Sequence, residues 1–171
     1  MKDEKYLEEL SLQLGQQLRQ LGKTVTSAES CTGGWIAKAL TDIAGSSAYY
    51  ERGFVTYSNE AKHQMIGVSS QTLENYGAVS QQVVLEMAEG ALNQANADFA
   101  ISVSGIAGPG GGTPDKPVGT VWFGFAHKID ENNLSLSAHH CIFEGDRHCV
   151  RLQSAIFSLE TLLQQITKKF A

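Results

Sequence analysis

The chain contains 171 residues, a length typical of one domain with its own hydrophobic core. Its hydrophobic share of 42% and charged share of 18% are ordinary for a globular protein. The formal net charge of −5 argues against a nucleic-acid-binding protein with a broad basic face, although it leaves room for a local basic pocket that holds one phosphate.

The first residues, MKDEK, are not followed by the apolar run of a secretory signal. No stretch approaches the roughly 18 consecutive apolar residues that a membrane-spanning helix needs. We therefore expect a cytoplasmic protein that does not associate with membranes.

The first half of the chain alternates helical and extended patterns. Leucines recur at three- and four-residue steps from Leu7 to Leu21, which predicts one apolar face of a helix ending near Gly22. The segments that follow are a strand over residues 24–28, a helix over 33–43, a strand over 53–57, a short helix through 65 and a further helical turn over 72–76. Ser58 or Asn59 could cap the short helix.

The second half predicts a capped helix, a buried strand, a hairpin and a long final helix. Ser80 begins a helix whose apolar side chains fall at helical spacing up to Leu92, and residues 99–103 form a buried-strand run. Residues 118–126 and 134–143 predict two longer strands joined by a turn over 130–133, and residues 146–168 predict the final helix. Together these elements predict a single α/β domain over residues 1–171, with three layers and a central mixed β-sheet flanked by helices.

The loop AESCTGG, residues 28–34, lies between a predicted strand and a predicted helix. Gly33 and Gly34 would let the backbone approach a ligand closely, and the helix that follows would point free N–H groups at the same place. Ser30 is then a candidate nucleophile whose oxyanion these N–H groups could stabilise. Alternatively, Ser30 or Thr32 only caps the helix. Cys31 is a rival nucleophile, or a buried neighbour that points the other way.

The segment YSNEAK, residues 57–62, follows the second predicted strand. Lys62 is either a solvated surface residue or a base, and a base near neutral pH would need a pKa lowered by about 3. Burial, or the positive end of a helix, could supply that shift. Tyr57 could pack as an ordinary strand aromatic or present its hydroxyl to the same site.

A glycine-rich loop over residues 104–112 follows the buried strand, and a pair of arginines begins the last helix. Ser104, Gly105 and Gly108 belong to this loop, which matches neither a P-loop nor a dinucleotide-binding fingerprint. Its N–H groups could hold a phosphate or an amide oxygen, or the loop could be a plain wide turn. Arg147 and Arg151 lie one helical turn apart, where they could bind a phosphate or simply pair with carboxylates.

The three cysteines form no Cys-x-x-Cys pair, so a disulfide framework is not expected. Five side chains near the C-terminus could ligate a metal, but their spacing matches no common zinc pattern. These are His139, His140, Cys141, His148 and Cys149. We expect no metal site, with these residues serving as ordinary strand and helix positions.

Five blocks in this order resemble the CinA C-terminal domain family, whose stand-alone members are nicotinamide-nucleotide amidases. The blocks are AESCTGG (28–34), GFVTYSNEAK (53–62), GAVS (77–80), SVSGIAGP (102–109) and KPVGTV (116–121). The resemblance implies hydrolysis of nicotinamide mononucleotide to nicotinic acid mononucleotide and ammonia, without a metal or organic cofactor. It also implies three catalytic residues, with Ser30 as nucleophile, Lys62 as base and Tyr57 beside them to orient the lysine or relay the proton.

The remaining expectations combine this resemblance with the residues themselves. Thr32, Gly33, Gly34, Ser104 and Gly105 are candidates for the oxyanion, and Gly108 and Arg147 for the phosphate. We expect a homodimer, since two-fold assemblies are the commonest. The alternative function is a nucleotide-binding or regulatory module that keeps the fold and turns nothing over.

Overall fold

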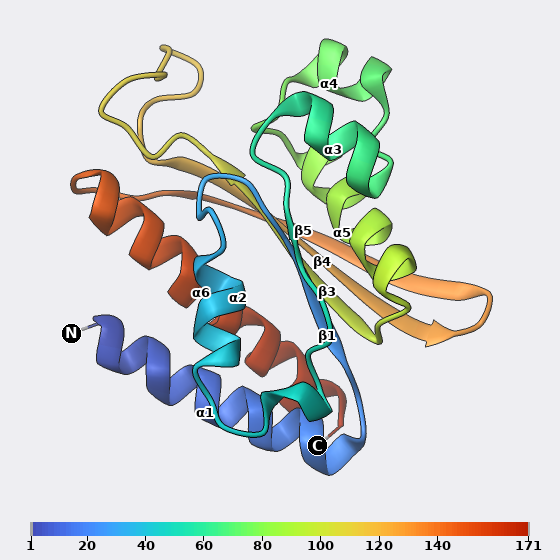
Figure 1. Ribbon diagram of the computed structural model, residues 1–171. Coiled ribbons are helices and arrows are strands. Elements are labelled where there is room, and N and C mark those ends of the chain that lie inside the picture. The colour runs from blue at the N-terminus through green and yellow to red at the C-terminus, as the bar shows by residue number, and fades with distance from the viewer. Residues whose placement is uncertain (1, 171) are drawn as a thin grey trace.

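A five-stranded mixed sheet runs through the middle of the computed structural model, which describes residues 2–170 (Figure 1). The strands are β1 (Val25–Glu29), β2 (Phe54–Val55), β3 (Phe99–Gly105), β4 (Thr120–Asp130) and β5 (Asn133–Ile142). They lie in the order β2-β1-β3-β4-β5. β1 is parallel to β2 and β3, and β4 is antiparallel to β3 and β5. The predicted α/β fold with a mixed sheet is confirmed.

Helices cover both faces of the sheet, so the fold has the three predicted layers (Figure 1). The helices are α1 (Glu4–Leu21), α2 (Trp35–Thr41), α3 (Asn59–Ile66), α4 (Ser70–Tyr76), α5 (Gln81–Ala95) and α6 (Arg147–Lys169), with a short 3-10 turn at Ser46–Ala48. α1, α2 and α6 pack on one face around Leu14, Ile36 and Phe123, and α3, α4 and α5 pack on the other around Ile66 and Met87.

Capping side chains explain where several helices begin. Ser80 accepts a hydrogen bond from the backbone N–H of Val83 and begins α5, and Asp146 accepts one from Cys149 and begins α6. The predicted cap Ser80 is confirmed, and the Asp146 cap agrees with the predicted start of the final helix at residue 146. α1 ends at Gly22, whose left-handed φ of 64° suits glycine, as the sequence predicted.

Several boundaries differ from the sequence expectations, and two of these differences affect the predicted site. The helix predicted from residue 33 begins only at Trp35, because Gly33 and Gly34 have φ values of 58° and 104° and so leave the helical conformation. The glycine-rich loop begins at residue 106, since Ser104 and Gly105 are still in β3, paired with Trp122 and Val121 of β4. The prediction that these two residues lie in a loop was therefore wrong.

The topology places loops from several elements at one edge of the sheet. β1 and β3 run parallel and end at the same edge, where the chain continues into residues 30–34 and 106–119 (Figure 1). In open α/β sheets, ligands bind at the carboxyl ends of parallel strands. This edge is therefore where a site is expected.

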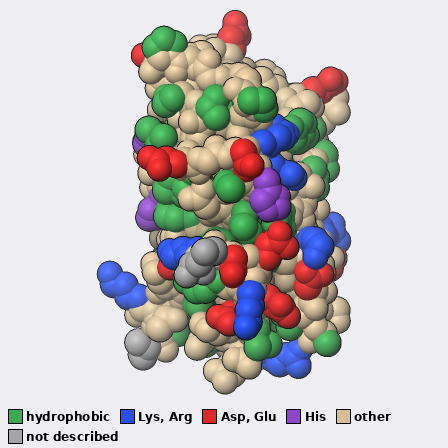
Figure 2. Space-filling model, turned by 90° about the vertical axis from the view of Figure 1, so that its left-hand side faces the viewer, with side chains coloured by type: hydrophobic (Ala, Val, Ile, Leu, Met, Phe, Trp, Pro, Cys, Tyr) green, Lys and Arg blue, Asp and Glu red, His purple; other side chains and the backbone are tan. Residues whose placement is uncertain are grey.

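Charges of both signs share the surface. On the face seen in Figure 2, acidic and basic side chains lie interspersed among hydrophobic ones. None of the described helices combines the length and the apolar character that crossing a membrane requires.

Candidate active site

Ser30 and Lys62 form a buried pair at this edge of the sheet. The Lys62 amine donates a hydrogen bond to the Ser30 Oγ at 2.9 Å and another to the Thr56 carbonyl at 2.9 Å. Lys62 is only 1% exposed and Ser30 8%. A hydroxyl held this close to a buried amine is the arrangement of a serine nucleophile with its base.

Burial also favours the neutral form of the Lys62 amine. Lys62 lies in α3, which Ser58 begins by accepting a hydrogen bond from Ala61, so Ser58 rather than Asn59 is the cap. Removal of the amine from water disfavours its charged form and lowers its pKa from 10.5 to about 8. Burial, one of the two causes considered for such a shift, is thus the one found. Lys62 is not the solvated surface lysine that the sequence left open.

Cys31 does not compete as a nucleophile. Its side chain is 6% exposed and packs in the core with α1, α2 and α6. Burial raises the pKa of the Cys31 thiol to about 12, so the reactive thiolate is scarce near neutral pH.

Tyr57 and Arg147 meet at the outer rim of the site. The Tyr57 side chain is 59% exposed, and its hydroxyl accepts a hydrogen bond from Arg147 Nη2 at 3.1 Å. Arg147 Nη1 donates to the Gly108 carbonyl at 2.9 Å. Tyr57 contacts Ser30 through its backbone, since its carbonyl accepts from Ser30 Oγ at 3.4 Å, while its hydroxyl bonds Arg147 rather than Lys62. The structure therefore gathers Tyr57, Gly108 and Arg147, which are far apart in sequence.

The loop over residues 106–119 lies next to residues 30–34, the serine loop. The Ser30 backbone N–H donates to the Val103 carbonyl at 3.0 Å, which holds the start of the serine loop against β3, the strand that leads into the long loop. The Gly119 N–H closes the base of the long loop by donating to Ile106 at 2.8 Å. A ligand above Ser30 would therefore touch both loops.

Glu29 is a functional candidate that sequence reasoning missed. This carboxylate is 1% exposed and binds the first turn of α2, accepting from the N–H groups of Ile36 and Ala37 at 2.9 Å each. The expectation that this helix points free N–H groups at a ligand is corrected, because Glu29 occupies two of them. Neither Ser30 nor Thr32 caps the helix, since Gly34 is the cap residue. The available signal was an acidic residue at the end of an otherwise uncharged buried strand.

The suggested metal ligands are dispersed. His139 packs against Phe125 and Phe157, whereas His140 stacks on Trp122, because neighbouring strand residues point to opposite faces. Among the side chains of residues 2–170, no group of three or more potential ligands comes together.

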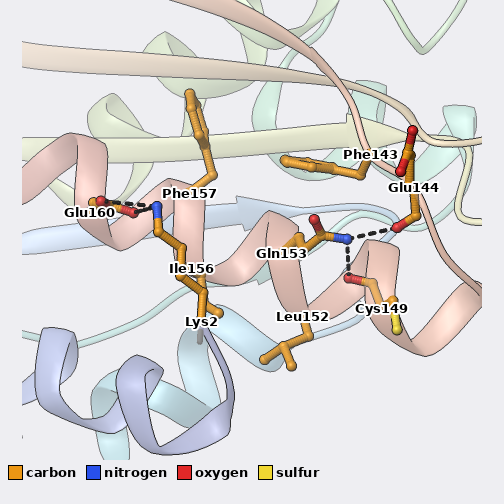
Figure 3. Close-up of a pocket in the computed structure, with 9 residues that line it drawn as sticks. All are labelled: Lys2, Phe143, Glu144, Cys149, Leu152, Gln153, Ile156, Phe157 and Glu160. Atoms are coloured by element: carbon orange, nitrogen blue, oxygen red, sulfur yellow. Dashed lines mark hydrogen bonds and ion pairs between the residues drawn. The ribbon is translucent and has the colours of Figure 1, made fainter.

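A groove of about 450 Å³ runs along α6 (Figure 3), and neither Ser30 nor Lys62 is among the residues that line it. It is lined by Leu152, Ile156 and Phe157, with Cys149 at one end and Lys2 bonded to Glu160 at the other. The hydrogen bond between Cys149 and the Asp146 carboxylate raises the pKa of that thiol, which disfavours a reactive thiolate. The Ser30 and Lys62 pair is therefore the stronger candidate for chemistry.

The fold agrees with the comparisons to known proteins. The model of the CinA C-terminal domain matches residues 7–166, and the chain belongs to this family. A relative from Enterobacter agglomerans, named nicotinamide-nucleotide amidohydrolase PncC, is 62% identical over 96% of this chain and 98% of its own length. The protein of the same name from Escherichia coli K12 is 61% identical over 93% of this chain and 94% of its own.

Solved structures show the same architecture. The competence/damage inducible protein CihA from Agrobacterium tumefaciens superposes with a TM-score of 0.88 at 46% identity, covering 92% of this chain and 94% of the other. A CinA superfamily protein from Klebsiella pneumoniae gives a TM-score of 0.89 at 38% identity, covering 95% and 98%.

Proposed function

We propose that this protein is an amidase that hydrolyses the carboxamide of nicotinamide mononucleotide to nicotinic acid mononucleotide and ammonia. The observation that carries the proposal is the 2.9 Å contact between Ser30 Oγ and the buried amine of Lys62. The names of the relatives that are 61% and 62% identical supply the substrate.

In this mechanism Ser30 attacks the carboxamide carbon while neutral Lys62 accepts the hydroxyl proton. The tetrahedral intermediate collapses when Lys62 passes that proton to the departing ammonia, which leaves an ester on Ser30. A water molecule then attacks the ester with Lys62 again as base, and nicotinic acid mononucleotide is released. The net reaction consumes one water and requires no metal or organic cofactor.

Tyr57, Gly108 and Arg147 form the proposed binding side of the site. The Arg147 guanidinium already bonds the Tyr57 hydroxyl and the Gly108 carbonyl, so it lies where a substrate phosphate could replace one of them. We propose that Arg147 binds the phosphate and that Tyr57 orients the nucleotide at the rim. Loss of a hydrogen bond to a charged group costs about 1.5–3 kcal/mol, so Arg147→Ala should raise KM about 10- to 100-fold.

Ammonia release from nicotinamide mononucleotide by the purified protein tests the activity directly. Ser30→Ala and Lys62→Ala should abolish release, and free nicotinamide should be a poor substrate because it lacks the phosphate. A fully active Ser30→Ala variant would rule out the serine mechanism. Calorimetric binding of the mononucleotide without turnover by the unmodified protein would instead favour the regulatory module.

We further propose a cytoplasmic homodimer that acts on this small molecule and binds neither nucleic acid nor membrane. Two chains of 18.5 kDa give 2 × 18.5 = 37 kDa, which light scattering on the purified protein would measure. A mass of one chain at micromolar concentration would contradict the dimer.

A further inference from the structure

Two charged side chains hold the serine loop although neither takes part in the mechanism above. Glu29 accepts a hydrogen bond from the Thr32 hydroxyl at 2.7 Å, besides its two bonds to α2. Arg151 of α6 donates from Nε to the Cys31 carbonyl at 3.1 Å and from Nη2 to the Thr32 carbonyl at 3.2 Å. Its guanidinium also lies over the Trp35 ring, 5.6 Å from the centroid.

The serine loop lies between two layers of the fold. Along β1, Ala28 packs against the α5 side of the sheet, whereas Glu29 points to α2 on the opposite side, as strand alternation requires. Ser30 then points back to α3, whose Lys62 reaches its hydroxyl. Arg151 comes from α6, in the layer opposite α3 (Figure 1). The base and Arg151 thus approach the loop from opposite sides.

Because a peptide group is planar, the contact of Arg151 with a carbonyl also fixes the direction of the N–H group in the same peptide. The Cys31 carbonyl and the Thr32 N–H belong to one trans peptide and point in opposite directions. Because Arg151 holds that carbonyl on the α6 side, the Thr32 N–H faces the side from which Lys62 reaches Ser30. Within residues 2–170 this N–H has no hydrogen bond to a protein acceptor, whereas the Gly33 N–H is bonded to the Ser30 carbonyl at 3.0 Å.

We infer that Arg151 is a positioning residue that fixes the peptide between Cys31 and Thr32, so that the Thr32 N–H donates to the oxyanion formed when Ser30 attacks. This inference rests on the proposed amidase function. The forked guanidinium suits the task because its Nε and Nη2 bond two successive carbonyls at once, whereas a lysine would offer a single point of attachment. Glu29 holds the other side of the same loop.

Steady-state kinetics of Arg151→Met test the inference, with Arg52→Met as the matched control. The Arg52 side chain is exposed and bonds the neighbouring Glu51 carboxylate, and the bond from the Thr26 hydroxyl to the Arg52 carbonyl is kept in the variant, so the replacement should leave the rates unchanged. Because an oxyanion exists only after attack, Arg151→Met should lower kcat about 10- to 100-fold while KM for nicotinamide mononucleotide changes less than about threefold. Millimolar guanidinium should restore part of kcat, and the same concentration of ammonium should not. Arg151→Lys is a second variant in case Arg151→Met does not fold. Its kcat should also fall about tenfold or more.

A fluorophosphonate probe separates this inference from the choice of substrate. The Ser30 oxygen bonds to phosphorus, the P–F bond breaks, fluoride leaves and the serine proton passes to Lys62, while the P=O oxygen occupies the oxyanion position. Mass spectrometry should show Ser30 labelled more slowly in Arg151→Met than in the Arg52→Met control. If the unmodified protein is labelled but does not hydrolyse the mononucleotide, slower labelling of the variant supports the inference and only the substrate is wrong. Equal labelling rates, unchanged kcat in folded Arg151→Met, or no labelling of the unmodified protein would each overturn it.

Discussion

The pH dependence of turnover should follow the proton on Lys62. With a pKa of about 8, about one tenth of the Lys62 amines are neutral at pH 7, compared with about 1 in 3,000 for an ordinary lysine at 10.5. Burial therefore raises the population of competent base about 300-fold. The neutral amine is the base, so kcat should rise as pH increases and level off above about pH 8.

Measurement of ammonia release at saturating nicotinamide mononucleotide, from pH 6 to 10, checks this reasoning. At pH 6 kcat should be about one hundredth of its plateau, with a slope of one in the logarithmic plot. Lys62→Arg is the informative control, because a guanidinium stays charged throughout this range and should leave kcat low at every pH. A kcat that does not change between pH 6 and 8 would refute the neutral Lys62 amine as the base.

Three further outcomes follow from the same contacts. Ser30→Ala should lower kcat at least about 10³-fold while the melting temperature, followed by circular dichroism, stays within a few degrees. Lys62→Met should be inactive yet more stable at pH 7, because the difference between 10.5 and about 8 corresponds to about 3 kcal/mol, offset by about 1 kcal/mol for the lost Thr56 hydrogen bond. Because the pKa of Lys62 is lower in the folded than in the unfolded protein, this gain in stability should be full below about pH 8 and fade towards pH 10.5. Urea unfolding at several pH values would show this dependence. Equal stability of the variant and the unmodified protein at pH 7 would contradict it. Gly90→Ala should destabilise the protein by about 1–3 kcal/mol and reduce kcat, because a Cβ there would overlap the Ile66 carbonyl and displace α3 with its Lys62; wild-type stability and kcat would count against this close packing.

Much of the fold could be predicted because the signals are local. Leucine spacing in α1, the caps Ser80 and Asp146 and the turn after Asp130 each act within a few residues, and the structure agrees with all of them. The extent of β3 could not be read in this way. Ser104 and Gly105 have a loop-like composition, and they are held in the sheet by pairing with distant β4.

The candidate site likewise contains some residues that the sequence could predict and others that it could not. Ser30 and Lys62 were proposed from their places after strands and from family resemblance, and the structure brings their side chains into contact. The sequence predicted no role for Glu29 or Arg151 in holding the serine loop. Their roles depend on which layer each side chain faces, and a carboxylate or guanidinium gives no local signal of a partner in another element.

The two-residue strand β2 has a consequence for how the site responds to heat. Ser30 follows β1, which is hydrogen-bonded on both sides, whereas Lys62 belongs to a segment that joins the sheet at its edge, through Phe54–Val55 and the bond from the Thr56 N–H to the Glu29 carbonyl. Opening free energies vary across a protein and are lowest where few backbone bonds hold a segment. Backbone amides of β2 and α3 should therefore exchange with deuterium sooner than those of β1 and β3. Warming would separate base from nucleophile while the rest of the molecule is still folded, so activity would be lost reversibly below the melting temperature.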